Sequence, residues 1–292
     1  KFASLSLRQD QELVLLAVKR NGRALAHAAE PLRADEKVVL AAVEQIGSAL
    51  QFASTDLKSN RTVALAAVKR DGTALRYVST ELANDREVAL VAMRSNLKAC
   101  VYTASHFLSD LDFMLDVVRH SGLALQVASP LLRANRELVR AAVQRTGLAF
   151  MYAAAELRTD VDFVLSMVDL DGLALQGAVA EVRRDRRVVS AAVKNNALAF
   201  QYAGENLLAD PVICLEAVMR CGVMLEHASE DLRKNWGIVF AAVTQTGSAI
   251  CYAAEGLKAD PSIKQAAGLD PEAPKYSFEG TCMTDHPLNL EQ

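Results

Sequence analysis

The sequence predicts an all-α fold, an α-solenoid of ten to eleven helix-turn-helix repeats of 25 residues each. When the chain is written in rows of 25 starting at Leu7, ten rows align without insertion or deletion, and an eleventh begins at Leu257. Every row has an Asp or Asn at one fixed position, then an apolar run, and in most rows a glycine after the run. A fixed period of this length is typical of stacked helical units. The rows are called repeats one to ten, so that repeat four spans residues 82–106.

The first element of each repeat is a helix whose start is marked by the Asp or Asn. These side chains accept hydrogen bonds from the free N–H groups of a first helical turn. Pro211 and Pro261 follow directly, at the first helical position, where a missing N–H costs nothing. The predicted N-caps are Asp10, Asp35, Asn60, Asp85, Asp110, Asn135, Asp160, Asp185, Asp210, Asn235 and Asp260.

This helix is expected to be buried on most sides, because the columns three to eight residues after the cap are almost wholly apolar. Its end is predicted at a glycine column, since glycine adopts the left-handed conformation that terminates many helices. Eight of the ten repeats have that glycine: Gly22, Gly47, Gly72, Gly122, Gly147, Gly172, Gly222 and Gly247.

A second, shorter helix is expected after the glycine, with Ala24, Leu25 and Ala28 on one face. A loop through Leu32 or its equivalent then leads to the next cap. A hairpin this short cannot bury its own apolar face, so consecutive hairpins must stack and share a core. The expected organisation is a lead-in at residues 1–6, a repeat domain at 7–267, and an extended C-terminal tail at 268–292, where the register is lost.

One recurring phrase carries a family resemblance. It reads LRADEKVVLAAVEQIGSALQFAS from Leu32 and LRANRELVRAAVQRTGLAFMYAA from Leu132. It resembles the repeat of domain-of-unknown-function family forty-one-sixteen, from Leu7 to about Ala267. The resemblance implies a helical repeat protein that binds other proteins, and it transfers no catalytic residue to this chain.

Composition and charge indicate which class of partner and which cellular compartment to expect. A net charge of -3 provides no field that would gather nucleic acid, so nucleic acid is not the expected partner. The five cysteines have irregular spacing and form neither a disulfide framework nor a zinc motif, which favours an intracellular reducing compartment, the cytosol or an organelle interior. The longest uncharged stretch, residues 236–254, has a polar turn in its middle, so no transmembrane segment is predicted.

The recurring acids are not interpreted as metal ligands, because capping explains both the Asp/Asn interchange and the proline after it. No catalytic residue, metal or cofactor is predicted. Departures from the repeat are the better functional candidates, since the scaffold does not require them. The candidate partner contacts are Leu97, which replaces the glycine of repeat four, its neighbours Lys98 and Tyr102, and Tyr276 and Phe278 in the tail.

Asp116 and Arg140 stand in normally apolar columns of consecutive repeats. We expect them to form an ion pair across the inner layer.

The function expected from these observations is a non-enzymatic protein–protein interaction scaffold or an auxiliary structural subunit, with protein partners in a multi-subunit complex. The sequence has no Ser/His/Asp, Cys/His or Gly-rich phosphate signature. Two alternatives stay open. One is a helical-repeat nucleic-acid binder, which needs a polar or basic column that reads one base per hairpin. The other is the repeat region of an enzyme or effector whose catalytic part is not in this chain.

Overall fold

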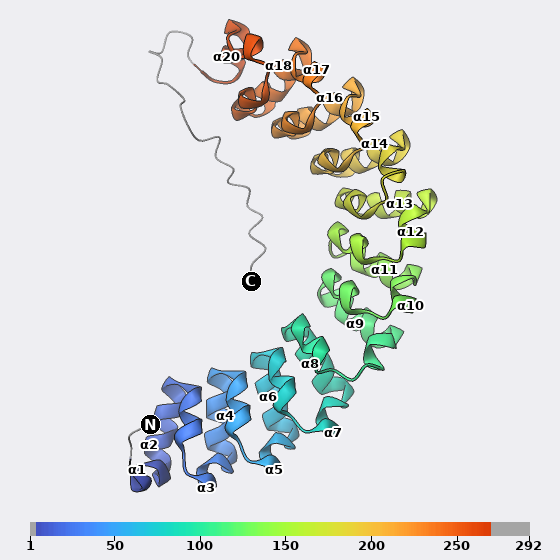
Figure 1. Cartoon of the computed structure of the whole chain (residues 1–292). Coiled ribbons are helices and arrows are strands. Elements are labelled where there is room, and N and C mark those ends of the chain that lie inside the picture. The colour runs from blue at the N-terminus through green and yellow to red at the C-terminus, as the bar shows by residue number, and fades with distance from the viewer. Residues whose placement is uncertain (1–3, 270–292) are drawn as a thin grey trace. The chain divides into compact units, whose positions relative to one another are not determined.

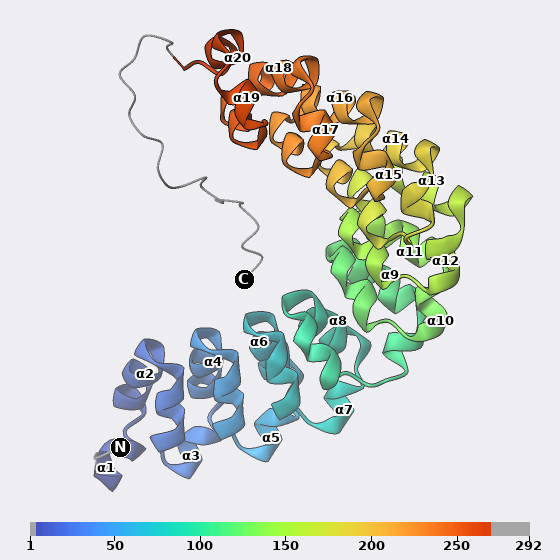
Figure 2. The same cartoon turned by 45° about the horizontal axis from the view of Figure 1, so that its top comes forward.

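The computed structural model describes residues 4–269, and this part of the chain is all-α, without a strand. It divides into two compact units, Lys1–Ala154 and Ala155–Gln292, each of which is described by itself. Within each unit the long helices of successive repeats pack side by side (Figures 1 and 2). The tail candidates Tyr276 and Phe278 lie outside the described residues.

Each 25-residue repeat contains three helical segments rather than two. The predicted first helix is an α-helix, and the predicted second helix is a 3₁₀-helix. The predicted loop is wrong, because it forms a further helix of about one turn. A side-chain cap supports that helix in several repeats, as where Ser54 Oγ accepts from the N–H of Leu57 at 3.4 Å.

The bounds are as follows. The long helices are α2 (Gln11–Arg20), α4 (Glu36–Gln45), α6 (Arg61–Arg70), α8 (Arg86–Ser95), α9 (Leu111–His120), α11 (Arg136–Val143), α13 (Val161–Val168), α14 (Arg186–Asn195), α16 (Pro211–Arg220), α18 (Trp236–Gln245) and α20 (Pro261–Ala266). The 3₁₀-helices after them are η1 (Gly22–His27), η2 (Gly47–Phe52), η3 (Gly72–Tyr77), η4 (Leu97–Val101), η6 (Gly122–Val127), η7 (Gly147–Tyr152), η8 (Gly172–Gly177), η10 (Ala197–Tyr202), η11 (Gly222–His227) and η12 (Gly247–Tyr252). The short connecting helices are α1 (Leu5–Gln9), α3 (Glu30–Arg33), α5 (Thr55–Lys58), α7 (Thr80–Ala83), η5 (Phe107–Ser109), α10 (Pro130–Arg133), α12 (Ala155–Thr159), η9 (Val182–Arg184), α15 (Glu205–Leu208), α17 (Glu230–Arg233) and α19 (Glu255–Lys258).

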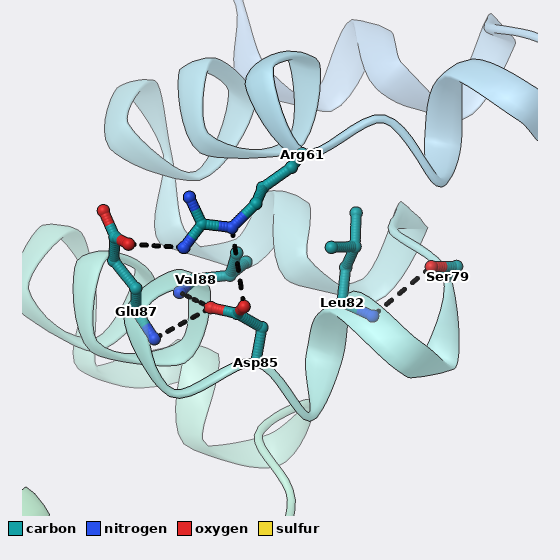
Figure 3. Close-up of polar contacts among 6 residues, drawn as sticks. All are labelled: Arg61, Ser79, Leu82, Asp85, Glu87 and Val88. Carbon is teal, nitrogen blue, oxygen red and sulfur yellow. Dashed lines mark hydrogen bonds and ion pairs between the residues drawn. The ribbon is translucent and has the colours of Figure 1, made fainter.

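All eleven Asp and Asn residues of the capping column accept a hydrogen bond from a backbone N–H two or three residues later. Asp85 is typical, since one carboxylate oxygen accepts from Glu87 at 2.9 Å and from Val88 at 3.0 Å (Figure 3). The other oxygen of Asp85 lies 3.5 Å from Arg61 Nε, which comes from the preceding repeat. The column therefore caps helices and also links neighbouring repeats.

The glycine column has a different cause from the one predicted. None of these glycines is left-handed, and Gly268 is the only glycine with a positive φ in the described part of the chain. Each instead begins a 3₁₀-helix. Six of these glycines lie against a carbonyl in the last turn of the next long helix: Gly22, Gly47, Gly72, Gly122, Gly172 and Gly222. A Cβ at Gly22 would lie 2.4 Å from the carbonyl oxygen of Ala42, and one at Gly72 would lie 2.1 Å from that of Ala92. Glycine is needed here because two backbones touch.

Backbone hydrogen bonds also join consecutive short helices. The N–H that precedes a short helix donates, in most repeats, to one of the last two carbonyls of the previous short helix, 21 residues earlier. In the first unit Ser54 donates to Arg33 at 2.9 Å, and in the second unit Gly204 donates to Arg183 at 2.7 Å. These bonds hold the short helices in a row along one edge of each unit.

The core consists of small and branched apolar side chains from the long and 3₁₀ helices. In repeat two, for example, Val39, Ala42 and Val43 of α4 and Leu50 of η2 are fully buried. Burying one such valine or leucine contributes about 1.5 to 3 kcal/mol. Because each repeat covers the next, the stability of the fold comes mainly from contacts between repeats.

Candidate interaction site at the fourth repeat

The turn of repeat four departs from the other repeats, as the Leu97 substitution predicted. The 3₁₀-helix η4 ends at Val101, one residue earlier than its equivalents, and Tyr102 is helical with φ -107° and ψ -8°. Asn96 still caps the segment, with its side chain accepting from the N–H of Lys98 at 3.0 Å. The start of the turn is therefore ordinary, and the change lies at its end.

Thr103 explains why the segment ends early. Small apolar residues, mostly alanine, occupy its column in the other repeats, and Thr103 is the one buried polar or charged residue in the described range. A buried hydroxyl without a partner would cost about 1 to 3 kcal/mol. Thr103 Oγ1 donates to the carbonyl of Ala99 at 3.0 Å, and the Thr103 N–H donates to the same oxygen at 3.0 Å. This closes a wider turn at the point where the other repeats continue a 3₁₀-helix.

The altered turn removes one backbone link between consecutive short helices. The bond that would join the Ala104 N–H to the Ala83 carbonyl is absent from the hydrogen bonds of residues 4–269, although its equivalents occur on both sides of it. The short segment that follows is a turn and the three-residue η5, a form that η9 shares in repeat eight. Repeat four thus lacks the backbone bond that ties its two ends together in the neighbouring repeats.

The altered turn exposes an apolar side chain beside cationic and aromatic groups. Val101 is 77% exposed, and Tyr102 next to it is also exposed. The Arg76 guanidinium lies 4.5 Å from the centre of the Tyr77 ring and donates to the Tyr77 hydroxyl. A hydrogen bond with Tyr102 raises the pKa of Arg76. With Lys98, these residues form a surface with an apolar centre and a basic border, called the fourth-repeat surface.

Aromatic rings and charges also meet at the junction of repeats four and five. Phe107 stacks on Phe113 with ring centres 4.8 Å apart, and Arg86 lies over Phe113 at 5.5 Å. Arg86 Nη2 is 3.4 Å from a carboxylate oxygen of Asp116. The expected pair of Asp116 with Arg140 is therefore wrong. Asp116 instead reaches back toward repeat four, where Arg86 already lies against the Phe113 ring.

Three of the five predicted contact residues lie together at this site: Leu97, Lys98 and Tyr102. Leu97 is half-buried, so it shapes the turn, whereas Lys98 and Tyr102 are exposed. Sequence reasoning missed Val101 and Thr103. Both could have been found by reading their columns, because Gln occupies the Val101 column in four other repeats and alanine dominates the Thr103 column.

The chemistry near the fourth-repeat surface fits contact better than reaction. Burial raises the pKa of the Cys100 thiol, which keeps it protonated and unreactive at neutral pH. A hollow of about 420 Å³ lies nearby at the turns of repeats two to four. Its polar groups are used internally, since Arg70 Nε donates to the carbonyl of Gln45 at 3.2 Å and Ser95 Oγ accepts from the N–H of Gly72 at 3.1 Å. The hollow is lined by Gln45, Ile46, Gly47, Arg70, Asp71, Ser95 and Asn96.

Between residues 4 and 269, His, Cys, Asp and Glu side chains nowhere gather in threes in a way that could hold a metal ion. The helices of the same range do not combine the length and apolar character needed to cross a bilayer.

Comparison with known proteins places the chain in a family. No curated protein and no solved structure matches it. The family model described as "Domain of unknown function (DUF4116)" matches residues 1–33, 35–83, 60–108, 110–158, 160–208 and 213–258. These segments cover most of the chain, so the protein belongs to the DUF4116 family.

Proposed function

We propose that this protein is an α-solenoid that acts as a non-enzymatic scaffold or auxiliary subunit and binds another protein through the fourth-repeat surface. The solenoid part of the proposal is supported by the links between repeats. Within each unit, most successive repeats share a glycine–carbonyl contact, and most successive short helices share a backbone hydrogen bond. Repeats that bury their apolar faces only against the repeats next to them in the sequence stack into a row that extends in one direction.

The observation that carries the binding proposal is the exposure of Val101 in a column that is mostly polar. The scaffold does not need valine there, because repeats with Gln at this position keep the regular turn. An exposed apolar residue beside a tyrosine and an arginine is the composition found at the centre of protein interfaces. With Arg76 and Lys98 at the border, the surface fits a partner segment with an apolar anchor and flanking acids.

The binding proposal is tested by purifying the tagged chain from its source cells, followed by size-exclusion chromatography, mass spectrometry and a nucleic-acid absorbance check. We expect a stoichiometric protein partner, lost in Val101→Gln and kept in the matched control Gln126→Ala, which changes the same column in repeat five. A lone monomer would contradict the proposal, and co-purifying RNA would favour a nucleic-acid binder. Because Gln is the residue of this column elsewhere, V101Q should fold normally.

The solenoid proposal is tested by small-angle X-ray scattering of the monomer. A compact globule of this length has a radius of gyration of ~19 Å. Units stacked in a single row require a clearly larger value. A radius near the globular value would overturn the solenoid without bearing on the fourth-repeat surface.

A further inference from the structure

A second exposed apolar surface lies on α16 and α18, two long helices that pack side by side in the second unit. Val212 is 62% exposed and Met219 is 63% exposed, and with Leu215 they lie on one face of α16. On α18, Trp236 is 46% exposed and stacks on Phe240 with ring centres 4.8 Å apart. Leu215 and Phe240 share one column of the repeat, so the two helices present the same side. These five residues are called the α16–α18 face.

The repeat itself does not require this face to be apolar. The column of Val212 is polar or charged in repeats one to eight, with Glu12, Lys37, Thr62, Glu87, Asp112, Glu137, Asp162 and Arg187. The column of Met219 is likewise polar or charged there, with Lys19, Glu44, Lys69, Arg94, Arg119, Gln144, Asp169 and Lys194. Val212 and Met219 therefore replace solvated side chains at positions that the fold leaves exposed. Contiguous apolar surface of this kind marks a binding site or a covered face.

The border of the face carries positive charge. Lys194, at the end of α14, and Arg220, at the end of α16, are exposed. Arg186 and Arg187 at the start of α14 are already paired with Asp210 and Asp185, and Glu216 is the one acid within α16. An occupant with apolar or aromatic side chains and a net negative charge would match both the centre and the border.

Residues 270–292 of the same chain have this composition. They lie outside the described residues, directly after the helix α20 that packs on α18. The segment contains one base, Lys275. Its acids are Asp270, Glu272, Glu279, Asp285 and Glu291, and its aromatic and large apolar residues are Tyr276, Phe278, Met283, Leu288 and Leu290.

The segment is long enough to reach the face. The path from α20 past α18 to α16 crosses two helix spacings, or roughly 16 to 20 Å at 8 to 10 Å each. The seven residues from Asp270 to Tyr276 span up to about 23 Å when extended. Tyr276 and Phe278 are thus the first aromatic side chains of the segment that could lie on Trp236 and Met219.

We propose that residues 270–292 bind the α16–α18 face of their own chain, with Tyr276 and Phe278 packed on Val212, Met219 and Trp236. This contact does not depend on the fourth-repeat surface.

Trp236 is the only tryptophan of the chain, so it reports directly on this contact. The experiment compares acrylamide quenching of Trp236 fluorescence in the full chain and in Tyr276→Ser/Phe278→Ser. We expect the quenching constant to rise about twofold and the emission to shift to longer wavelength in the double variant, because the indole ring loses its cover. The matched control Asn289→Ser should behave like the unchanged chain. Equal quenching in all three proteins would overturn the proposal.

A second variant changes the face instead of the tail. Val212→Glu/Met219→Glu introduces the residue type that stands in these columns at Glu87 and Glu44, so the helices should form normally, as circular dichroism can check. We expect the same rise in quenching as with the tail variant, whereas Leu131→Glu, an exposed apolar position in the other unit, should leave quenching unchanged. Unchanged quenching in V212E/M219E would count against the proposal.

A dilution experiment distinguishes binding of the tail to its own chain from binding to a second copy of the protein. A contact within one chain has a high effective concentration and does not weaken on dilution. We therefore expect the protection of Trp236 to be the same over a hundredfold change in protein concentration, about the range that distinguishes the two cases. Protection that disappears on dilution, together with a dimer in light scattering, would overturn the intramolecular contact.

Discussion

Repeats four and eight both lack the glycine that begins the 3₁₀-helix elsewhere, yet only repeat four loses the regular turn. Ala197 of repeat eight begins a full six-residue helix, and the Gly204 N–H still bonds the Arg183 carbonyl at 2.7 Å. Repeat four has Leu97 at the same position, a shortened helix, and no bond between Ala104 and Ala83 among the described residues.

The difference shows how much the contact between repeats tolerates. One methyl group at Ala197 fits, and the neighbouring helices α14 and α16 pack somewhat less closely than α16 and α18 do. In repeat four the larger side chain of Leu97 occurs together with Thr103, whose hydroxyl donates a hydrogen bond to the carbonyl oxygen of Ala99. The result is an exposed surface beside a turn that lacks one backbone hydrogen bond.

The largest expected effect comes from adding a methyl group where the backbones touch. Gly72→Ala places a Cβ 2.1 Å from the Ala92 carbonyl oxygen and should lower the free energy of unfolding by about 2 kcal/mol. The reverse change, Ala197→Gly, should alter it by less than about 1 kcal/mol. Urea unfolding of both variants measures this. Equal effects would mean that close approach is not the reason for the glycine.

Restoring the repeat's own residues in repeat four should rebuild the missing link. Leu97→Gly/Thr103→Ala should return the six-residue 3₁₀-helix and the bond from the Ala104 N–H to the Ala83 carbonyl. One regained backbone bond of about 1 kcal/mol slows amide exchange roughly fivefold. Hydrogen exchange at Ala104 measures it. Because the two changes act on one turn, each single variant should give less than half of the effect, and additive slowing would argue against a shared cause.

The capping column allows the cap and the charge to be separated. Asp210→Ala removes the acceptor for the Val212 and Ile213 N–H groups and should cost about 1 kcal/mol. Asp210→Asn keeps the acceptor, as Asn60 and Asn235 do in their repeats, and should cost a few tenths of that. Thermal unfolding compares the two variants. A similar loss in both would mean that the charge matters more than the cap.

The smallest effect concerns acid stability. Arg186 donates to Asp210 at 2.9 Å and lowers the pKa of that carboxyl. Because the folded pKa lies below the unfolded value of about 3.9, the stabilisation is complete above that value and is lost as the pH falls through the folded pKa. Between about pH 5 and pH 2, the free energy of unfolding should fall less steeply with falling pH in Asp210→Asn than in the unchanged chain. An equally steep loss of stability in both proteins would argue against the pair of Arg186 and Asp210 as the cause.

Local features of the sequence predicted much of this structure. The start of each long helix was marked by an Asp or Asn, because capping depends on one side chain and the N–H groups next to it. The departure at Leu97 was visible because ten aligned repeats define what is ordinary at each position. The same comparison of columns could have found Thr103, whose hydroxyl is the decisive feature of that turn.

The tertiary structure decided what depends on a neighbour. The glycines looked like helix ends, but their cause is the carbonyl of the next repeat, which lies 20 residues further along the chain. The predicted loop is a short helix, and the N–H before it bonds the previous short helix 21 residues earlier, a partner that the local sequence does not show. Asp116 forms an ion pair with Arg86 rather than with Arg140, because the partner of a charged side chain is set by its distance in space. The sequence alone determined the period and the helix starts, which are local properties. The contacts between repeats set the form of the turns and the exposed surfaces, because packing depends on residues that the local sequence does not contain.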